Sequence, residues 1–92
     1  MPSALRTRVR FAALLHSYTT GASVVEVEPG TVSSVMAELD RRFPGLAFRI
    51  VDEQGRIRPH MNVFLNEYLI RDPTTPVAAG SELYLVGALS GG

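Results

Sequence analysis

The last two residues of the sequence, Gly91 and Gly92, are the ones whose type and position point most directly to chemistry. Glycine has no Cβ, so a Gly-Gly end can be extended, narrow and free in φ and ψ. A carboxylate at such an end can pass through a tight channel into the active site of another protein. Loose chain ends often contain glycine, so the pair gains its weight from the elements that precede it.

The residues just before the two glycines are expected to form a flexible tail. Small residues dominate this stretch, and they bury too little area to dock against a folded body. We therefore expect a folded domain at residues 1–86 and a flexible tail at residues 87–92. Within the tail, Leu89 and Ser90 are expected to contact the protein that receives it.

The clearest element upstream of the tail is a helix that follows Pro29-Gly30. Thr31 is a good N-cap, because its hydroxyl can accept a hydrogen bond from an unpaired backbone N–H of the first turn. Apolar residues then recur at the spacing of one helical stripe, at Val32, Val35, Met36, Leu39 and Phe43. Pro44-Gly45 is expected to end this helix.

Alternating apolar and polar residues predict strands on both sides of the helix. Residues 6–11 and 24–28 are expected to pair as a hairpin, with Arg8 and Arg10 facing water or a partner. Three further strands are expected at residues 61–65, 68–70 and 82–86. The order ββαβββ predicts an α+β fold, in which one main helix packs on one face of a mixed sheet.

The segment between the helix and the third strand has a weaker pattern. Leu46, Phe48 and Ile50 alternate with other residues, as in a strand. Residues 52–55 are expected to form an exposed turn.

The second face of the predicted sheet has no helix to cover it. The expected register places an apolar patch on this face, bordered by two arginines: Phe64, Leu69, Tyr84 and Val86, with Arg8 and Arg10. Exposed apolar patches often mark interfaces, and aromatic residues and arginine are enriched there. We therefore expect partner binding on this face. The alternative is that some of these side chains are buried, since a register slip of one residue exchanges the two faces.

Composition argues against several other function classes. The sequence contains no cysteine, which excludes disulfides, thiol catalysis and thiolate-bound metals. Its formal net charge is zero, so no nucleic-acid or membrane partner is expected. His16 and His60 have no carboxylate at a ligand-like spacing, and no metal site is expected. Without a secretion signal or an apolar run long enough to span a bilayer, a cytoplasmic protein is expected.

Over nearly its whole length the sequence resembles the MoaD/ThiS group of sulfur carriers, which have the ubiquitin-like β-grasp fold. The resemblance is carried by the first strand, the start of the helix, the later strands and the terminal glycines, at residues 9–14, 29–32, 63–67, 77–83 and 91–92. Residues 58–71 are most similar to the longer carriers of the cysteine-biosynthesis type. Two positions depart from the family pattern: residues 87–90 lack a common proline, and Ser81 replaces a frequent acidic residue.

The resemblance implies chemistry at Gly92 that other proteins carry out. A ThiF/MoeB-like adenylating enzyme would use ATP and magnesium to adenylate the Gly92 carboxylate, because a carboxylate oxygen is a poor leaving group. A persulfide from a sulfurtransferase, or sulfide, would then displace AMP and leave a thiocarboxylate. A sulfur-accepting synthase would take the sulfur. The chain itself would bind no cofactor and would act as a co-substrate instead of an enzyme.

Two other function classes remain open. A ubiquitin-like modifier would use the same tail and the same activation to join Gly92 to lysines of other proteins. The sequence has nine arginines and no lysine, so it could not form lysine-linked chains of itself, which favours the carrier. A plain β-grasp binding subunit would keep its partner affinity without Gly91 and Gly92. The acceptor pathway is also open, among cysteine, molybdopterin, thiamine and related products.

Overall fold

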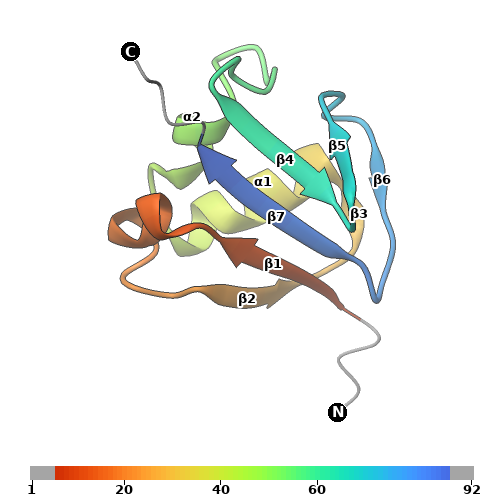
Figure 1. Ribbon diagram of the computed structural model, residues 1–92, viewed down its shortest axis with the longest axis horizontal. Helices are drawn as coiled ribbons and strands as arrows, with labels where there is room; N and C mark the ends of the chain where they lie inside the picture. Colours follow the sequence, from red (N-terminus) through yellow and green to blue (C-terminus); the bar gives the residue numbers. More distant parts are fainter. Residues whose placement is uncertain (1–5, 88–92) are drawn as a thin grey trace.

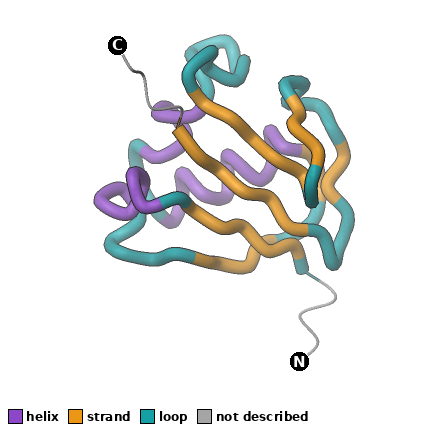
Figure 2. Tube along the Cα trace, viewed as in Figure 1, coloured by secondary structure: helices purple, strands orange, loops and turns teal. Residues whose placement is uncertain are grey.

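A five-stranded mixed sheet with one main helix on one of its faces forms the body of the molecule (Figures 1 and 2). The computed structural model describes residues 6–87. The strands lie in the order β2-β1-β7-β4-β5. Their bounds are β1 Thr7–Phe11, β2 Val24–Val27, β4 Met61–Leu65, β5 Tyr68–Ile70 and β7 Glu82–Gly87. A second, two-stranded sheet joins β3 (Gly30–Thr31) to β6 (Pro76–Val77).

The centre of the main sheet is a parallel pair made from opposite ends of the chain. β1 and β7 run parallel, whereas β1 pairs antiparallel with β2, and β4 pairs antiparallel with both β5 and β7. A parallel pair needs a long crossover connection, and here the crossover contains the main helix α1 (Val32–Arg42). The predicted strands and their pairing as a mixed sheet are therefore confirmed.

Helix α1 begins where the sequence predicts. The Thr31 hydroxyl accepts a hydrogen bond from the Ser34 backbone N–H at 3.2 Å, and the Ser34 hydroxyl accepts one from the Thr31 N–H at 2.9 Å. This reciprocal capping satisfies two backbone donors of the first turn. Gly30 precedes the cap, and a Cβ at that position would lie only 2.3 Å from the Ser34 Oγ atom. Glycine there leaves room for the cap to close.

The core lies between α1 and the covered face of the sheet. The predicted helical stripe is buried, and it packs against alternate residues of the central strands: Val32, Val35, Met36 and Leu39 from α1, and Val9, Phe11, Val63, Leu83 and Leu85 from the sheet. Phe43 caps the end of the helix, with its ring 6.1 Å from that of Phe11 in an edge-to-face arrangement. Burying each leucine-sized side chain contributes about 1.5–3 kcal/mol.

The expectation for residues 46–50 is wrong. They form a short helix, α2 (Leu46–Ile50), which begins after Gly45 in the left-handed region at φ 96°. Leu46 and Ile50 are one helical turn apart and both buried, whereas Phe48 is 55% exposed. Alternation and helical spacing both fit three apolar residues at 46, 48 and 50. Packing against α1 selects the helix.

Two further details differ from the sequence prediction. The connection between β1 and β2 contains a 3₁₀ helix, η2 (Ala13–Tyr18), where only a polar connection was expected. Gly87, expected to start the tail, is the last residue of β7 and pairs with Met61 of β4. None of the helices within residues 6–87 is long and apolar enough to cross a membrane.

Candidate functional site

The residues proposed for the chemistry itself, Gly91 and Gly92, lie outside the described residues, as do Leu89 and Ser90. The structure does describe the end of the strand that leads to them. Gly87 is the last described residue, and it lies at the end of β7, beside β4. β7 is the middle strand of the sheet, so the surfaces on both sides of it are close to the point where residue 88 follows.

The uncovered face of the sheet carries all six described residues predicted for partner binding. Arg10 pairs with Tyr84, Tyr84 with Phe64, and Phe64 with Leu69. Directly paired residues point to the same side of a sheet, as do residues two apart on one strand. The row therefore shares its face with Arg8 and Val86. We call the surface formed by Arg8, Arg10, Phe64, Leu69, Tyr84 and Val86 the open face.

Aromatic contacts order the centre of the open face. The rings of Phe64 and Tyr84 are stacked, with centroids 6.4 Å apart and an interplanar angle of 30°. The Arg10 guanidinium lies over the Tyr84 ring, and it also forms an ion pair with Glu82 at 3.5 Å. Leu69 is 53% exposed. The centre is thus a largely apolar platform with a fixed cation at one side, which suits a protein partner.

Val24 extends this face and was missed in the sequence prediction. It pairs with Arg10 from the neighbouring strand β2 and is 38% exposed. Valine is common in strands, so the residue type of Val24 gave no separate indication that it lies on a binding surface. Asn62 also lies on this face, opposite Val86, where its amide oxygen accepts a hydrogen bond from Arg71 at 3.3 Å.

A groove of about 310 Å³ lies beside Gly87, and sequence reasoning missed it as well. Its walls come from η2, from α2, from the start of β4 with the residue before it, and from the end of β7. The lining residues are Leu14, Leu15, Ser17, Tyr18, Arg49, His60, Met61 and Gly87. We call it the Gly87 groove. Figure 1 shows η2 and α2 near the end of β7. Neither helix was predicted. The spacing of Leu46 and Ile50 was a usable signal for α2, but nothing local placed η2 beside it.

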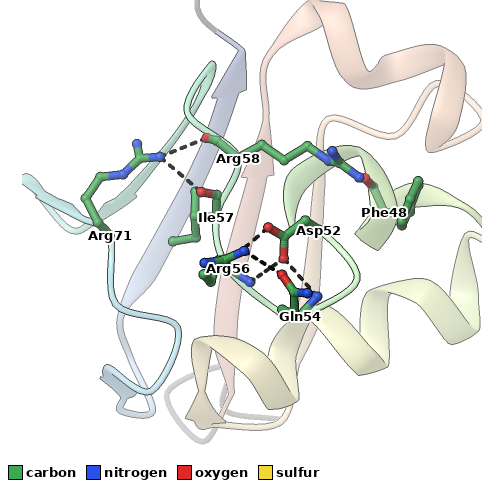
Figure 3. A network of polar contacts seen from close by, with 7 residues as sticks. All are labelled: Phe48, Asp52, Gln54, Arg56, Ile57, Arg58 and Arg71. Carbon is green, nitrogen blue, oxygen red and sulfur yellow. Dashed lines mark hydrogen bonds and ion pairs between the residues drawn. The ribbon is translucent and has the colours of Figure 1, made fainter.

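The loop between α2 and β4 is held by a polar network (Figure 3). The Arg71 guanidinium donates hydrogen bonds to the carbonyls of Met61 at 2.7 Å, Arg58 at 2.8 Å and Ile57 at 3.4 Å. Arg58 in turn donates to the Phe48 carbonyl at 2.8 Å and stacks on the Phe48 ring. Because this loop leads directly into Met61, the network also fixes one wall of the Gly87 groove.

Carboxylates with a shifted pKa lie in turns and on the surface of α1, away from the open face. Hydrogen bonds from Arg42 and Arg41 lower the pKa of Glu38, and backbone N–H groups of Arg56 and Gln54 lower that of Asp52. The Thr74 hydroxyl and backbone N–H lower the pKa of Asp72. These contacts stabilise local structure, and the shifts favour the ionised form, so none of these groups is prepared for acid–base work near neutral pH.

No group of three or more metal-ligating side chains is present within residues 6–87. His16 contacts the Phe11 carbonyl through its Nε2 atom at 3.1 Å, which ties η2 to the end of β1. His60 lines the Gly87 groove instead.

Known proteins with similar sequences and structures share one architecture. The sulfur carrier protein CysO of Mycobacterium tuberculosis is 23% identical over 93 residues, which cover 96% of this chain and all of that protein. The crystal structure of the Amycolatopsis orientalis BexX/CysO complex contains a chain that is 26% identical, with a TM-score of 0.86 over 94% of this chain and 99% of that one.

A third relative is SAMP1, small archaeal modifier protein 1, of Haloferax volcanii. It is 28% identical, with a TM-score of 0.79 over 95% of this chain and 99% of that one. The ubiquitin-like β-grasp fold predicted from the sequence is thereby confirmed. The family model for the ThiS family matches residues 9–92, which include the open face except Arg8, the Gly87 groove and both terminal glycines, so the chain belongs to the ThiS family.

Proposed function

We propose that this chain is a sulfur carrier protein whose reactive group is the Gly92 carboxylate. The observation that carries the proposal is the ThiS family match, which extends through Gly91 and Gly92. Similarity to CysO, a sulfur carrier protein, over the whole of both chains supports the same function. The chain then acts as a co-substrate, and the catalytic groups belong to its partners.

The proposed reaction sequence at Gly92 begins with activation of the carboxylate and ends with its return. A ThiF/MoeB-like enzyme joins the carboxylate to AMP from ATP, with magnesium, and releases pyrophosphate. Sulfide then displaces AMP and leaves a thiocarboxylate. With a persulfide as nucleophile, the product is an acyl disulfide, which a second thiol must reduce before the thiocarboxylate is free. The thiocarboxylate sulfur finally forms a bond to the acceptor in a synthase, and water then cleaves the acyl C–S bond, which leaves the sulfur on the acceptor and returns the Gly92 carboxylate.

The open face is proposed as the surface that docks on the adenylating enzyme. It offers stacked aromatic rings and an arginine held over them, the residue types that dominate the energetic centres of interfaces. It also includes β7, the strand that leads toward Gly92. Binding at this face would place the start of the tail at the surface of the enzyme. The BexX/CysO complex provides a similar chain bound to another protein.

The intact mass of the untagged chain tests this function. The chain is incubated with ATP, magnesium, a sulfur source and an extract of its own cells. A mass increase that matches exchange of one oxygen for one sulfur, located at Gly92 by fragmentation, is the expected result. A variant that lacks Gly91 and Gly92 is the matched control and should show no such increase. An unchanged mass in an extract that thiolates a known carrier would contradict the proposal.

A ubiquitin-like modifier is the second candidate, because the chain is also similar to SAMP1. The same mass experiment separates the two functions. Isopeptide bonds between Gly92 and lysines of other proteins, without a thiocarboxylate, would favour the modifier. One bulky residue added after Gly92 should abolish either activity and leave the fold intact.

A further inference from the structure

The arginines of this chain differ in whether a carboxylate neutralises them. Five of them pair with carboxylates within residues 6–87: Arg6, Arg10, Arg41, Arg42 and Arg56. The other four, Arg8, Arg49, Arg58 and Arg71, have no carboxylate within ion-pair distance in this part of the chain, and of these Arg49 and Arg58 are the two whose guanidinium groups lie over aromatic rings. Both lie at the end of the molecule where β7 finishes, Arg49 on α2 and Arg58 in the loop that follows it.

Aromatic rings hold both of these arginines. The Arg49 guanidinium lies 5.0 Å from the centroid of the Tyr18 ring, and the Arg58 guanidinium lies 4.5 Å from that of Phe48. A ring beneath the plane of a guanidinium leaves N–H donors at its edge available. A planar fork held in this way is suited to bidentate binding of a carboxylate.

The Gly87 groove places Arg49 next to an apolar surface. Leu14, Leu15 and Met61 supply that surface, while Arg49 and His60 supply nitrogen donors, and none of the residues within 6–87 that line the groove carries a carboxylate. Leu14 is 59% exposed, so its side chain offers apolar surface that a ligand in the groove can cover. A ligand that matches this groove combines a carboxylate with an apolar side chain, as an acidic peptide segment does.

We propose that the Gly87 groove, with Arg49 at its rim, binds an acidic segment of the enzyme that activates Gly92. This inference rests on the proposed function, because the occupant is the enzyme that activates Gly92. The groove lies next to Gly87, the last described residue before the tail. Charge complementarity favours an acidic segment, because Arg49 lines the groove. This contact would be separate from the contact on the open face. Contacts of the enzyme with both the open face and the Gly87 groove, on different sides of β7, would orient the tail as well as bind the carrier.

Steady-state kinetics with the purified adenylating enzyme test this proposal. Arg49→Glu reverses the charge at the groove and should raise the KM for the carrier about tenfold or more, with little change in kcat. Arg49→Gln should have a smaller effect. Arg41→Glu is the matched control, because Arg41 has an exposed side chain on α1 and does not line the groove, so its reversal should leave KM within about twofold.

Site-directed photocross-linking identifies the occupant independently of the kinetics. A photoreactive phenylalanine at Leu14 should cross-link to a peptide of the enzyme that contains Asp or Glu, whereas one at Ser33, on the exposed side of α1, should not. Cross-linking to a peptide without acidic residues, to a second copy of this chain or to its own residues 88–92 would overturn the proposal.

The two proposals fail in different ways. If the wild-type chain is not adenylated at all, the proposed function is wrong and the groove loses its occupant with it. If the wild-type chain is adenylated and Arg49→Glu has the wild-type KM, only the role of the groove is wrong. Urea unfolding of each variant shows whether a change in KM reflects lost folding.

Discussion

The Arg10 guanidinium lies 4.1 Å above the centroid of the Tyr84 ring, although the two residues come from opposite ends of the sequence. Parallel pairing of β1 with β7 places them directly opposite each other. A cation over an exposed aromatic ring contributes about 0.5–1 kcal/mol. The larger consequence is geometric, because the ring is held between Arg10 and Phe64 and cannot turn freely.

This arrangement predicts that Tyr84 is an energetic centre of partner binding. Tyr84→Ala should raise the KM of the adenylating enzyme for the carrier by about tenfold or more, with kcat nearly unchanged. Tyr68→Ala is the matched control: Tyr68 is 76% exposed on β5, and its pairing with Leu65 places it on the other side of the sheet. Equal effects of the two substitutions on KM would contradict a role for the open face.

Arg71 is predicted to stabilise the loop before β4. From its position just after β5, Arg71 donates to the carbonyls of Ile57, Arg58 and Met61, and no side chain of the loop itself supplies these hydrogen bonds (Figure 3). Arg71→Ala should lower the free energy of unfolding by about 1–3 kcal/mol, measured by urea titration. Arg71→Lys should recover little, because an ammonium lacks the planar fork.

Arg56→Ala provides the comparison within the same loop. Its side chain is 72% exposed and forms a surface ion pair with Asp52, so the expected loss is about 0.5 kcal/mol or less. If both substitutions cost the same, the Arg71 contacts contribute nothing specific.

The turn at Asp52 is predicted to weaken in acid. Asp52 accepts hydrogen bonds from the backbone N–H groups of Arg56 and Gln54, both at 2.9 Å, and these lower its pKa below the ordinary value of 3.8. A lowered pKa in the folded state means that the stabilisation is fully present above the unfolded-state pKa. It is lost as the pH falls through the folded-state pKa. The free energy of unfolding should therefore decrease with acidification below pH 3.8.

Asp52→Asn isolates this contribution to the pH dependence. The variant keeps an acceptor but no titrating charge, so urea titrations across this pH range should show a shallower decrease than in the wild type. Gln54→Ala keeps the backbone donor and should retain the wild-type slope. An Asp52→Asn slope as steep as that of the wild type would assign the acid sensitivity to Glu38 and Asp72, whose pKa values are also lowered.

Asn66 is predicted to lock the turn after β4 onto β7. Its φ is 58°, its N–H donates to the Glu82 carbonyl at 2.8 Å, and its Oδ1 accepts from the Glu82 N–H at 3.1 Å. Asn66→Ala should cost about 2 kcal/mol, because it loses the side-chain hydrogen bond and strains the left-handed backbone. Asn66→Gly tolerates that backbone and should cost about 1 kcal/mol. Equal thermal midpoints for the two variants would show that the backbone conformation does not contribute.

The sequence was sufficient wherever a long local pattern matched one structure only. The stripe of α1, with Thr31 as its cap, has the period of a helix and of nothing else. Alternation in β1, β4 and β7 assigned their residues to the correct faces, so the six described residues of the open face were predicted from sequence. The family resemblance added the order in which these elements pair.

Local pattern failed where a segment was short. Leu46, Phe48 and Ile50 fit a strand by alternation and a helix by the spacing of 46 and 50. Five residues cannot separate these periods. Contact of α2 with α1 made the choice: the helix buries Leu46 and Ile50 and leaves Phe48 55% exposed, whereas a strand would place all three on one face.

By itself, the sequence determined the capped helix and the side of the sheet on which the aromatic residues lie, because each depends on periodicity or on a motif within a few residues. It also determined the family and the fold class, because the order of the elements and the resemblance extend over nearly the whole chain. Only the tertiary structure decided that Arg10 stacks on Tyr84, that Arg71 holds the carbonyls of a distant loop, and that η2 and α2 enclose a groove beside Gly87. Those contacts join residues far apart in the chain. Their geometry is set by the packing of the whole domain, which no local pattern encodes.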